Sequence, residues 1–436
     1  MAKHSERRGD RKIIQLKDHL SQREAPPQEP ETDQAPDQEA PEEEGVQASI
    51  EYDGEEKKKQ ARQVPKAFYR VVLVLLVLIV GLALWVNRDN LTPESIWSWL
   101  QVQVTGDGEG DGYPAAITGS TVSEGNFLSV SGNAVALSDT SLTILGPSGQ
   151  ELLSQRHSLS QPILKSASDS YLLYNQNSTG YMVVSGTQLR LEASTEQDIL
   201  TGAIASNGRF ALATRGVNGA SDLTVYLATG EVQFTYSFAQ DYITALALNG
   251  DGTWAMVCTA RSQGGQLISK VTVFDLNSTT PAAEYESQDN LLLGAGWGDN
   301  GVLYAVGDAS LLRARSGELS FSEYSYQGRT PTAFQFAGGQ CYLSVSAYEH
   351  AGASTLLVFR GQEDPLEIQA EQRIVSLSVY GGSVGALAGQ QLVVYDASTG
   401  QELARQDAGN DAKSIALFSE SGAYVLGVSE IRRLQL

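Results

Sequence analysis

Leu392-Val-Val-Tyr395, followed by Thr399-Gly400-Gln401-Glu402-Leu403, is typical of a strand that ends in a tight turn. A short apolar run ends, a turn with glycine follows, and an apolar residue resumes the chain. Glycine can supply the positive φ angle that a tight hairpin needs. The same pattern recurs along the chain, which indicates a repeat of β-hairpins. The other copies are Ser148-Gly149-Gln150-Glu151-Leu152, Thr229-Gly230-Glu231-Val232 and Ser316-Gly317-Glu318-Leu319.

A second motif, a glycine followed closely by an aromatic residue, alternates with the first. Since the two motifs alternate, we expect the glycine–aromatic turn to join the first and second strands of a unit, and the first motif to join the third and fourth. The copies of the second motif are Asn207-Gly208-Arg209-Phe210, Asp251-Gly252-Thr253-Trp254, Gly339-Gln340-Cys341-Tyr342 and Ser421-Gly422-Ala423-Tyr424.

The candidate first strands recur at spacings of 36 to 48 residues. Four strands in about 40 residues form one blade of a β-propeller. Eight starts favour an all-β propeller of eight blades, with seven as the close alternative and a tandem of β-sandwiches as the competing fold. The last unit has room for three strands only, so we expect Ala115–Ser120 to complete it and close the ring. The starts lie near Asn126, Pro162, Ile199, Tyr242, Asn290, Pro331, Arg373 and Ala412.

An uninterrupted apolar run, Val71–Val86, precedes the repeats. It is slightly shorter than the roughly 20 residues that cross a bilayer, but Arg70 can extend it by snorkelling to the headgroups. We therefore predict one transmembrane helix, residues 67–88, that contacts the lipid bilayer through Val71–Val86. Six cations precede the span closely and only Arg88 follows it before Arg156, so the positive-inside rule places the N-terminus in the cytoplasm and the C-terminus outside.

The remainder of the chain divides into three regions of different composition. Residues 1–66 form a cytoplasmic tail that is largely acidic and rich in proline, which predicts disorder. Residues 89–112 combine a helix start at Thr92-Pro93-Glu94 with a Gly/Asp linker. The propeller is expected at residues 113–436. A formal net charge of −21 excludes nucleic acid as a partner, because nucleic-acid binding depends on neutralising phosphates with Lys and Arg.

Several short motifs imitate known chemistry, and we interpret each as structural. Gly381-Gly-Ser383-Val-Gly385 matches a nucleophile elbow, but a hairpin is expected where the elbow needs a strand-to-helix turn. Gly296-Trp-Gly298-Asp-Asn-Gly301 spells a dinucleotide motif without a following helix. Asp107-Gly-Glu109-Gly-Asp111-Gly112 imitates half of an EF-hand loop, and a solvated linker is favoured over a weak calcium site.

Cysteine and histidine are too scattered for a soft metal site. Cys258 and Cys341 are 83 residues apart, about two repeats, so we expect two buried, unpaired thiols in non-adjacent blades rather than a disulfide. His157 and His350 are the only histidines beyond the span. No catalytic, cofactor-binding or metal-binding residues are assigned.

Two resemblances add to these expectations. The turns Asp396-Ala-Ser-Thr-Gly400-Gln-Glu-Leu403 and Asn249-Gly-Asp-Gly-Thr-Trp254 resemble those of quinoprotein-like and WD40-like propellers. The layout of residues 65–436 resembles an uncharacterised family of clostridial single-pass membrane proteins, through Leu91-Thr-Pro-Glu94 with Trp97 and Trp99, Gly110-Asp-Gly-Tyr-Pro114 and the His157 to Pro162 segment. The second resemblance implies a Gram-positive cell envelope and carries no activity.

The favoured function is a membrane-tethered binding or scaffold protein of the cell envelope that docks a protein, peptide or glycan. A rigid ring on a tether, without a catalytic constellation or a cofactor, favours this hypothesis. Two alternatives remain open. One is a transmembrane sensor or assembly factor. The other is an envelope polysaccharide hydrolase, since 35 acidic residues lie beyond the span and a glycosidase needs two close carboxylates.

Overall fold

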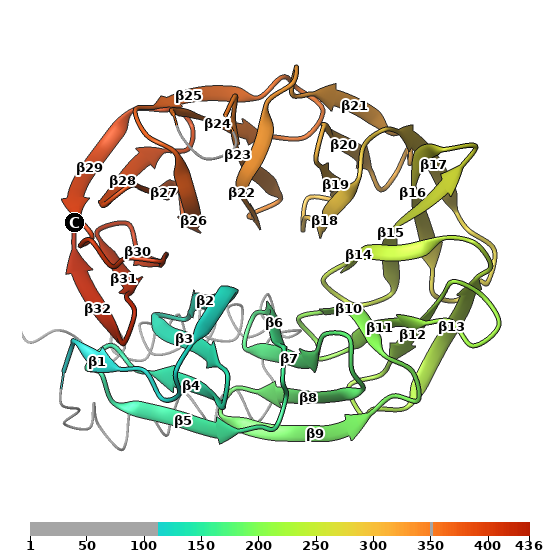
Figure 1. Ribbon diagram of the computed structural model, residues 1–436, viewed down its shortest axis with the longest axis horizontal. Coiled ribbons are helices and arrows are strands. Elements are labelled where there is room, and N and C mark those ends of the chain that lie inside the picture. Colours follow the sequence, from blue (N-terminus) through green and yellow to red (C-terminus); the bar gives the residue numbers. More distant parts are fainter. Residues whose placement is uncertain (1–111, 349–351) are drawn as a thin grey trace, which may run out of the picture. The chain divides into compact units, whose positions relative to one another are not determined.

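The structure, a computed structural model, describes residues 112–348 and 352–436 as strands and turns. They form eight four-stranded antiparallel sheets arranged in a ring (Figure 1), so the prediction of an eight-bladed propeller is confirmed. No helix in these two ranges is long and apolar enough to cross a bilayer. The predicted cytoplasmic tail, the Val71–Val86 span, the juxtamembrane helix and the linker as far as residue 111 lie outside the described residues.

The first four blades follow the chain from the innermost strand outward. Blade 1 holds β2 (Val122–Val130), β3 (Asn133–Ser138), β4 (Ser141–Leu145) and β5 (Glu151–Arg156). Blade 2 holds β6 (Pro162–Ala167), β7 (Ser170–Asn175), β8 (Gly180–Ser185) and β9 (Gln188–Ser194). Blade 3 holds β10 (Ile199–Ile204), β11 (Phe210–Arg215), β12 (Ser221–Tyr226) and β13 (Val232–Phe238). Blade 4 holds β14 (Tyr242–Leu248), β15 (Trp254–Gln263), β16 (Gln266–Asp275) and β17 (Ala283–Gln288).

The last four blades repeat this order, and the final one takes its outermost strand from the start of the domain. Blade 5 holds β18 (Leu292–Trp297), β19 (Val302–Gly307), β20 (Ser310–Arg315) and β21 (Ser322–Ser325). Blade 6 holds β22 (Thr330–Ala337), β23 (Gln340–Ser346), β24 (Ser354–Phe359) and β25 (Leu366–Ala370). Blade 7 holds β26 (Ile374–Tyr380), β27 (Ser383–Ala388), β28 (Gln391–Asp396) and β29 (Glu402–Asp407). Blade 8 holds β30 (Ser414–Ser419), β31 (Gly422–Leu426), β32 (Glu430–Gln435) and β1 (Ala115–Ala116).

The ring closes in blade 8, where β1 pairs antiparallel with β32 and Ala115 lies opposite Ile431. The predicted closure by Ala115–Ser120 is thus confirmed, with a paired strand of two residues. Tyr113 fastens this strand, because its hydroxyl donates to the carbonyl of Gly146 in blade 1 (3.0 Å) and its ring lies 5.2 Å from that of Tyr424 in blade 8.

The hydrophobic core lies between the blades as eight clusters, one at each junction of neighbouring blades. Side chains of the innermost strands add bonds across these junctions. The amide of Asn126 in β2 donates to Pro162 O (2.7 Å) and accepts from Leu164 N (2.9 Å), which ties blade 1 to blade 2. Ser378 of β26 likewise accepts from Leu417 N of β30 at 2.8 Å.

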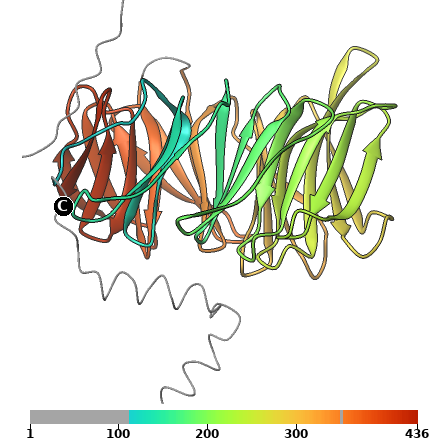
Figure 2. The ribbon, with the colours of Figure 1, turned by 90° about the horizontal axis from the view of Figure 1, so that it is seen from below.

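The two faces of the ring differ in the connections that they carry. We call the face where the innermost strands begin the upper face; it holds the links between blades and the turns between second and third strands. The lower face holds the other two turns of each blade. Both turn motifs predicted from the sequence fall on this lower face, in the predicted order. The hairpin between β15 and β16, each 10 residues long, extends beyond its neighbours in the side view (Figure 2).

Predicted boundaries shift by up to four residues, for physical reasons. Strand β2 begins at Val122 rather than near Asn126, since its register is interrupted between Val122 and Phe127. Strand β18 begins at Leu292 because Asn290 caps the neighbouring turn, where its Oδ1 accepts from two backbone amides.

One turn of the first motif departs from expectation. Gly149, Gly230 and Gly400 take positive φ angles, but in the fourth copy Leu319 does so instead of Gly317.

Candidate functional site

The glycines of the Gly296-Trp-Gly298 motif allow blades 5 and 6 to pack closely. A methyl group on Gly294 would lie 2.5 Å from the ring of Phe334, and one on Gly296 would lie 2.4 Å from the ring of Phe336. The absence of side chains on β18 therefore makes room for two phenyl rings from β22. Gly298 meets the backbone of Gly339 in the same way. The motif holds no helix N-terminus for a pyrophosphate, which agrees with the structural interpretation.

The apparent nucleophile elbow is a hairpin, as predicted. Gly381 and Gly382 form the two-residue turn between β26 and β27, and Ser383 is the buried first residue of β27. His157 lies in the link after blade 1, where Leu159 N donates to its Nδ1 (3.2 Å) and its Nε2 lies 3.1 Å from Ser138 O. His350 and the acidic residues of the EF-hand-like stretch lie outside the described residues.

Both cysteines are buried and unpaired, as predicted, in blades 4 and 6. Burial raises the pKa of the Cys258 thiol to about 12 and also raises that of Cys341, so both stay protonated at neutral pH. Within residues 112–348 and 352–436, no three His, Cys, Asp or Glu side chains are grouped to hold a metal ion.

Three acidic side chains have lowered pKa values because they accept hydrogen bonds that hold turns in place. Hydrogen bonds from Ser398 and Thr399 lower the pKa of Asp396 to about 2. Bonds from Thr253 and Asn249 lower that of Asp251, and bonds from Ser120 and Thr121 lower that of Asp139. A general acid needs a raised carboxyl pKa, so these groups are suited to fixing turns rather than to proton transfer.

The upper face carries a ring of exposed apolar side chains. We call it the upper ring, and blades 3 to 8 each contribute one residue, either from the start of an innermost strand or from the turn between second and third strands. The residues and their exposed fractions are Val217 (64%), Tyr242 (54%), Leu293 (45%), Tyr348 (69%), Val375 (40%) and Val428 (53%).

The other large apolar residues that are exposed in the described ranges do not form such a set. Leu189, Val232 and Leu403 lie on three separate outermost strands, while Phe334 is in the middle of β22 and Tyr380 at the lower end of β26. Six of the eleven large apolar residues that are exposed in the described ranges thus lie on the upper face, one on each of blades 3 to 8.

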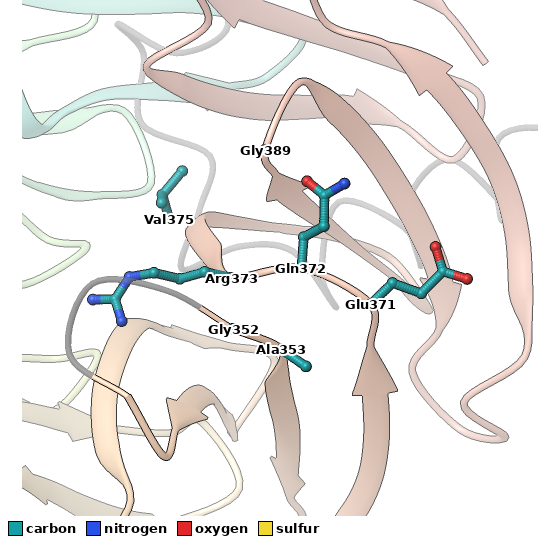
Figure 3. Close-up of a pocket in the computed structure, with 7 residues that line it drawn as sticks. All are labelled: Gly352, Ala353, Glu371, Gln372, Arg373, Val375 and Gly389. Atoms are coloured by element: carbon teal, nitrogen blue, oxygen red, sulfur yellow. The ribbon is translucent and has the colours of Figure 1, made fainter.

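A hollow of about 420 Å³ opens on the upper face between blades 6 and 7, beside Val375 (Figure 3). Glu371, Gln372 and Arg373 follow one another along its edge in the link between β25 and β26. The Arg373 guanidinium donates to the carbonyl of Tyr348 (3.1 Å), which joins the hollow to the upper ring.

Ion pairs stiffen the opposite side of the upper face, at the β15–β16 hairpin. Arg261 bonds Asp241 at 3.1 Å and Glu286 at 2.7 Å, and these bonds raise the pKa of its guanidinium. Asp241 directly precedes Tyr242 of the upper ring, so these ion pairs fix the chain beside Tyr242.

The centre of the propeller is accessible to solvent. Gly125, Lys165, Ser166 and Phe334 are exposed although they lie within innermost strands, whose flanks pack against neighbouring blades. Glu124 of β2 and Lys165 of β6 are the only charged residues on the eight innermost strands.

Neither charged residue forms an ion pair or hydrogen bond with another described side chain. Lys165 is exposed on the innermost strand of blade 2, and desolvation by the protein around its ammonium group lowers the pKa of that group.

The sequence did not predict the upper ring or the two charged residues on innermost strands, Glu124 and Lys165. Lys165 carried a usable signal, since it lies inside the first strand predicted to start near Pro162, whereas Glu124 precedes the start predicted near Asn126. The upper ring left no such signal in the sequence, because the exposure of a valine or leucine depends on how the blades assemble into the propeller.

Part of the chain matches a protein family, and solved structures share a low level of similarity with it. Residues 113–318, less than half of the chain, match a family of unknown function (DUF5711). Similar solved structures include BamB from Moraxella catarrhalis, 9% identical, covering 74% of this chain and 100% of that chain with a TM-score of 0.47. Hydrazine synthase from Kuenenia stuttgartiensis is 9% identical and covers 64% of this chain and 97% of that chain with a TM-score of 0.45. A search of curated proteins found no match. Nothing about binding or activity follows from these likenesses.

Proposed function

We propose that this protein is a membrane-tethered binding or scaffold protein of the cell envelope, whose propeller docks a partner protein on its upper face. The observation that carries the proposal is the upper ring, one exposed apolar residue from each of six consecutive blades. Docked protein surface would remove these side chains from water at about 25 cal/mol per Å² of apolar area.

The charge of the propeller narrows the chemistry of the partner. Residues 112–436 contain 16 Lys and Arg against 30 Asp and Glu, a net charge of −14. Such a surface attracts cationic and neutral partners and repels polyanions. Together with the apolar upper ring, this favours a protein with apolar and basic side chains over an acidic glycan.

The tether rests on the sequence. Val71–Val86 is long enough to cross a bilayer with snorkelling flanks, and the preceding cations favour a cytoplasmic N-terminus. In this arrangement the propeller is extracytoplasmic, and the resemblance of residues 65–436 to clostridial membrane proteins favours a Gram-positive envelope.

The test compares two matched pairs of substitutions in the full-length protein. Leu293→Asp with Val375→Asp alters the upper ring, whereas Leu189→Asp with Leu403→Asp alters outermost strands of similar exposure. Each protein is tagged, extracted from its own membranes in mild detergent and washed at 0.3 M salt, and thermal unfolding confirms that each is folded. The upper-face pair should lower recovery of the bound protein at least tenfold, and the outer pair should leave it unchanged. Equal recovery, or a loss with the outer pair alone, contradicts the proposal.

A further inference from the structure

The residues of the upper face and of the channel divide between the blades. Blades 3 to 8 each contribute one apolar residue to the upper ring, and blades 1 and 2 contribute the two channel charges, Glu124 and Lys165. The upper ring lies on the upper face, and the two charged residues lie on innermost strands, which begin at that face.

The two charges lie at different depths. Asn126 bonds the backbone at Pro162 and Leu164, so it is level with Ile163 of β6. Glu124 precedes Asn126 by two residues and Lys165 follows Ile163 by two. Since the register of β2 is interrupted between Val122 and Phe127, this gives the order of the two residues only, with Glu124 nearer the upper face. The cation is thus the deeper group.

Lys165 leaves β6 on the side that faces blade 3. Its neighbours two residues away, Ile163 and Ala167, pack into the core between blades 2 and 3. Lys165 itself is exposed and has no described anionic partner. A partly desolvated ammonium gains more from an anion than an ammonium in bulk water does.

We propose that the upper face binds the C-terminal end of a partner polypeptide, whose terminal carboxylate reaches Lys165 while apolar side chains near it contact the upper ring. This inference rests on the proposed function and adds the class of ligand. Glu124 at the channel mouth and the acidic surface then favour basic residues upstream of the terminus. A free anion would gain none of the apolar contacts and would meet the same acidic surface, so the polypeptide end fits better.

The experiment uses the full-length protein in detergent and three synthetic heptapeptide libraries. Two of them have lysine in the first two positions, two glycines in the middle and random apolar residues in the last three; one of these two ends in a free carboxylate and the other in an amide. A third, amidated library ends in glutamate and separates a side-chain carboxylate from a terminal one. Retained peptides are quantified by mass spectrometry.

We expect the free-acid library to be enriched at least tenfold over the amide on the wild-type protein. Lys165→Gln should reduce this ratio to about one, and Lys165→Arg should retain most of it. Lys413→Gln is the matched control, because Lys413 is exposed on the upper face just before β30 and should leave the ratio unchanged. Thermal unfolding of each variant confirms folding.

An equal acid and amide enrichment on the wild-type protein, or no retention of either library, overturns the inference. So does a Lys165→Gln protein that keeps the wild-type ratio. Enrichment of the glutamate library alone would replace the terminal carboxylate with a side chain and would also count against it. If partner recovery still depends on Leu293 and Val375 in these cases, the proposed function stands while the C-terminal ligand is rejected.

Discussion

Gly294 and Gly296 show how a single missing side chain directs the assembly of neighbouring blades. The two glycines of β18 lie under the rings of Phe334 and Phe336, which themselves lie 5.7 Å apart. A motif that resembles a phosphate-binding loop is here a surface made for aromatic packing. Its spelling does not distinguish the two uses, because both rely on close approach to bare backbone.

Gly296→Ala should destabilise the propeller by about 1–3 kcal/mol, the usual cost of adding a methyl group to a packed core. The new Cβ would lie 2.4 Å from the ring of Phe336, so that ring must move. Gly317→Ala is the control, since nothing lies within 4 Å of its Cβ position. Urea unfolding of both variants measures the effect. Equal midpoints would show that β18 and β22 do not pack as described.

Lys165 should react with acetic anhydride at lower pH than a lysine in a reference peptide. Burial lowers its pKa from the ordinary value of 10.5, so a larger fraction is neutral and nucleophilic at each pH below that value. Peptide mapping between pH 6 and 11 measures the rate for each lysine. A midpoint at or above 10.5 would contradict the desolvated channel position.

The lowered pKa of Lys165 also makes stability depend on pH. Between the folded-state pKa and 10.5 the unfolded chain holds a proton that the folded chain has released, so the free energy of unfolding rises with pH through this window. Below the window both states are protonated, and the unfavourable contribution of the desolvated ammonium is fully present.

The turn motifs predicted the number and order of strands in the blades, because the residues that form a turn are adjacent in the sequence. A tight turn needs particular residues, and the spacing of such turns fixes strand number and order. The exception shows the limit: in the fourth copy of the first motif the chain places Leu319, not Gly317, at positive φ, as Leu319 N and Glu318 N both donate to Arg315 O. The upper ring was not predictable in this way, since exposure of Val217 or Leu293 depends on distant blades.

Closure of blade 8 depends on the short strand β1 and on Tyr113. Tyr113→Ala removes the hydrogen bond to Gly146 and the ring contact with Tyr424, worth together about 2 kcal/mol. We expect a lower midpoint in thermal unfolding and earlier protease cleavage near residue 113. Tyr348→Ala, a change at a side chain that is 69% exposed, should leave stability within about 0.5 kcal/mol. Equal stability of the two variants would mean that Tyr113 does not secure the ring.

The structure describes the propeller, whereas the membrane span before it is a prediction from the sequence. The orientation of that span has a direct test. Arg70→Asp removes the cation nearest its N-terminal end and should reduce the fraction of protein whose C-terminal tag is digested by protease added to intact cells. Arg88→Asp, on the other side, should not reduce it. Unchanged digestion of the Arg70→Asp protein would contradict the proposed orientation.

The central claim is that a partner protein docks on the upper face. Val217 and Val232 belong to the same blade, are 64% and 58% exposed, and lie on the upper face and on the outermost strand respectively. The most direct measurement is photo-cross-linking in intact cells, with a photoreactive amino acid placed at one position or the other. If the partner docks on the upper face, position 217 gives a discrete adduct and position 232 gives none. Adducts of equal yield at both positions, or an adduct from position 232 alone, would contradict it.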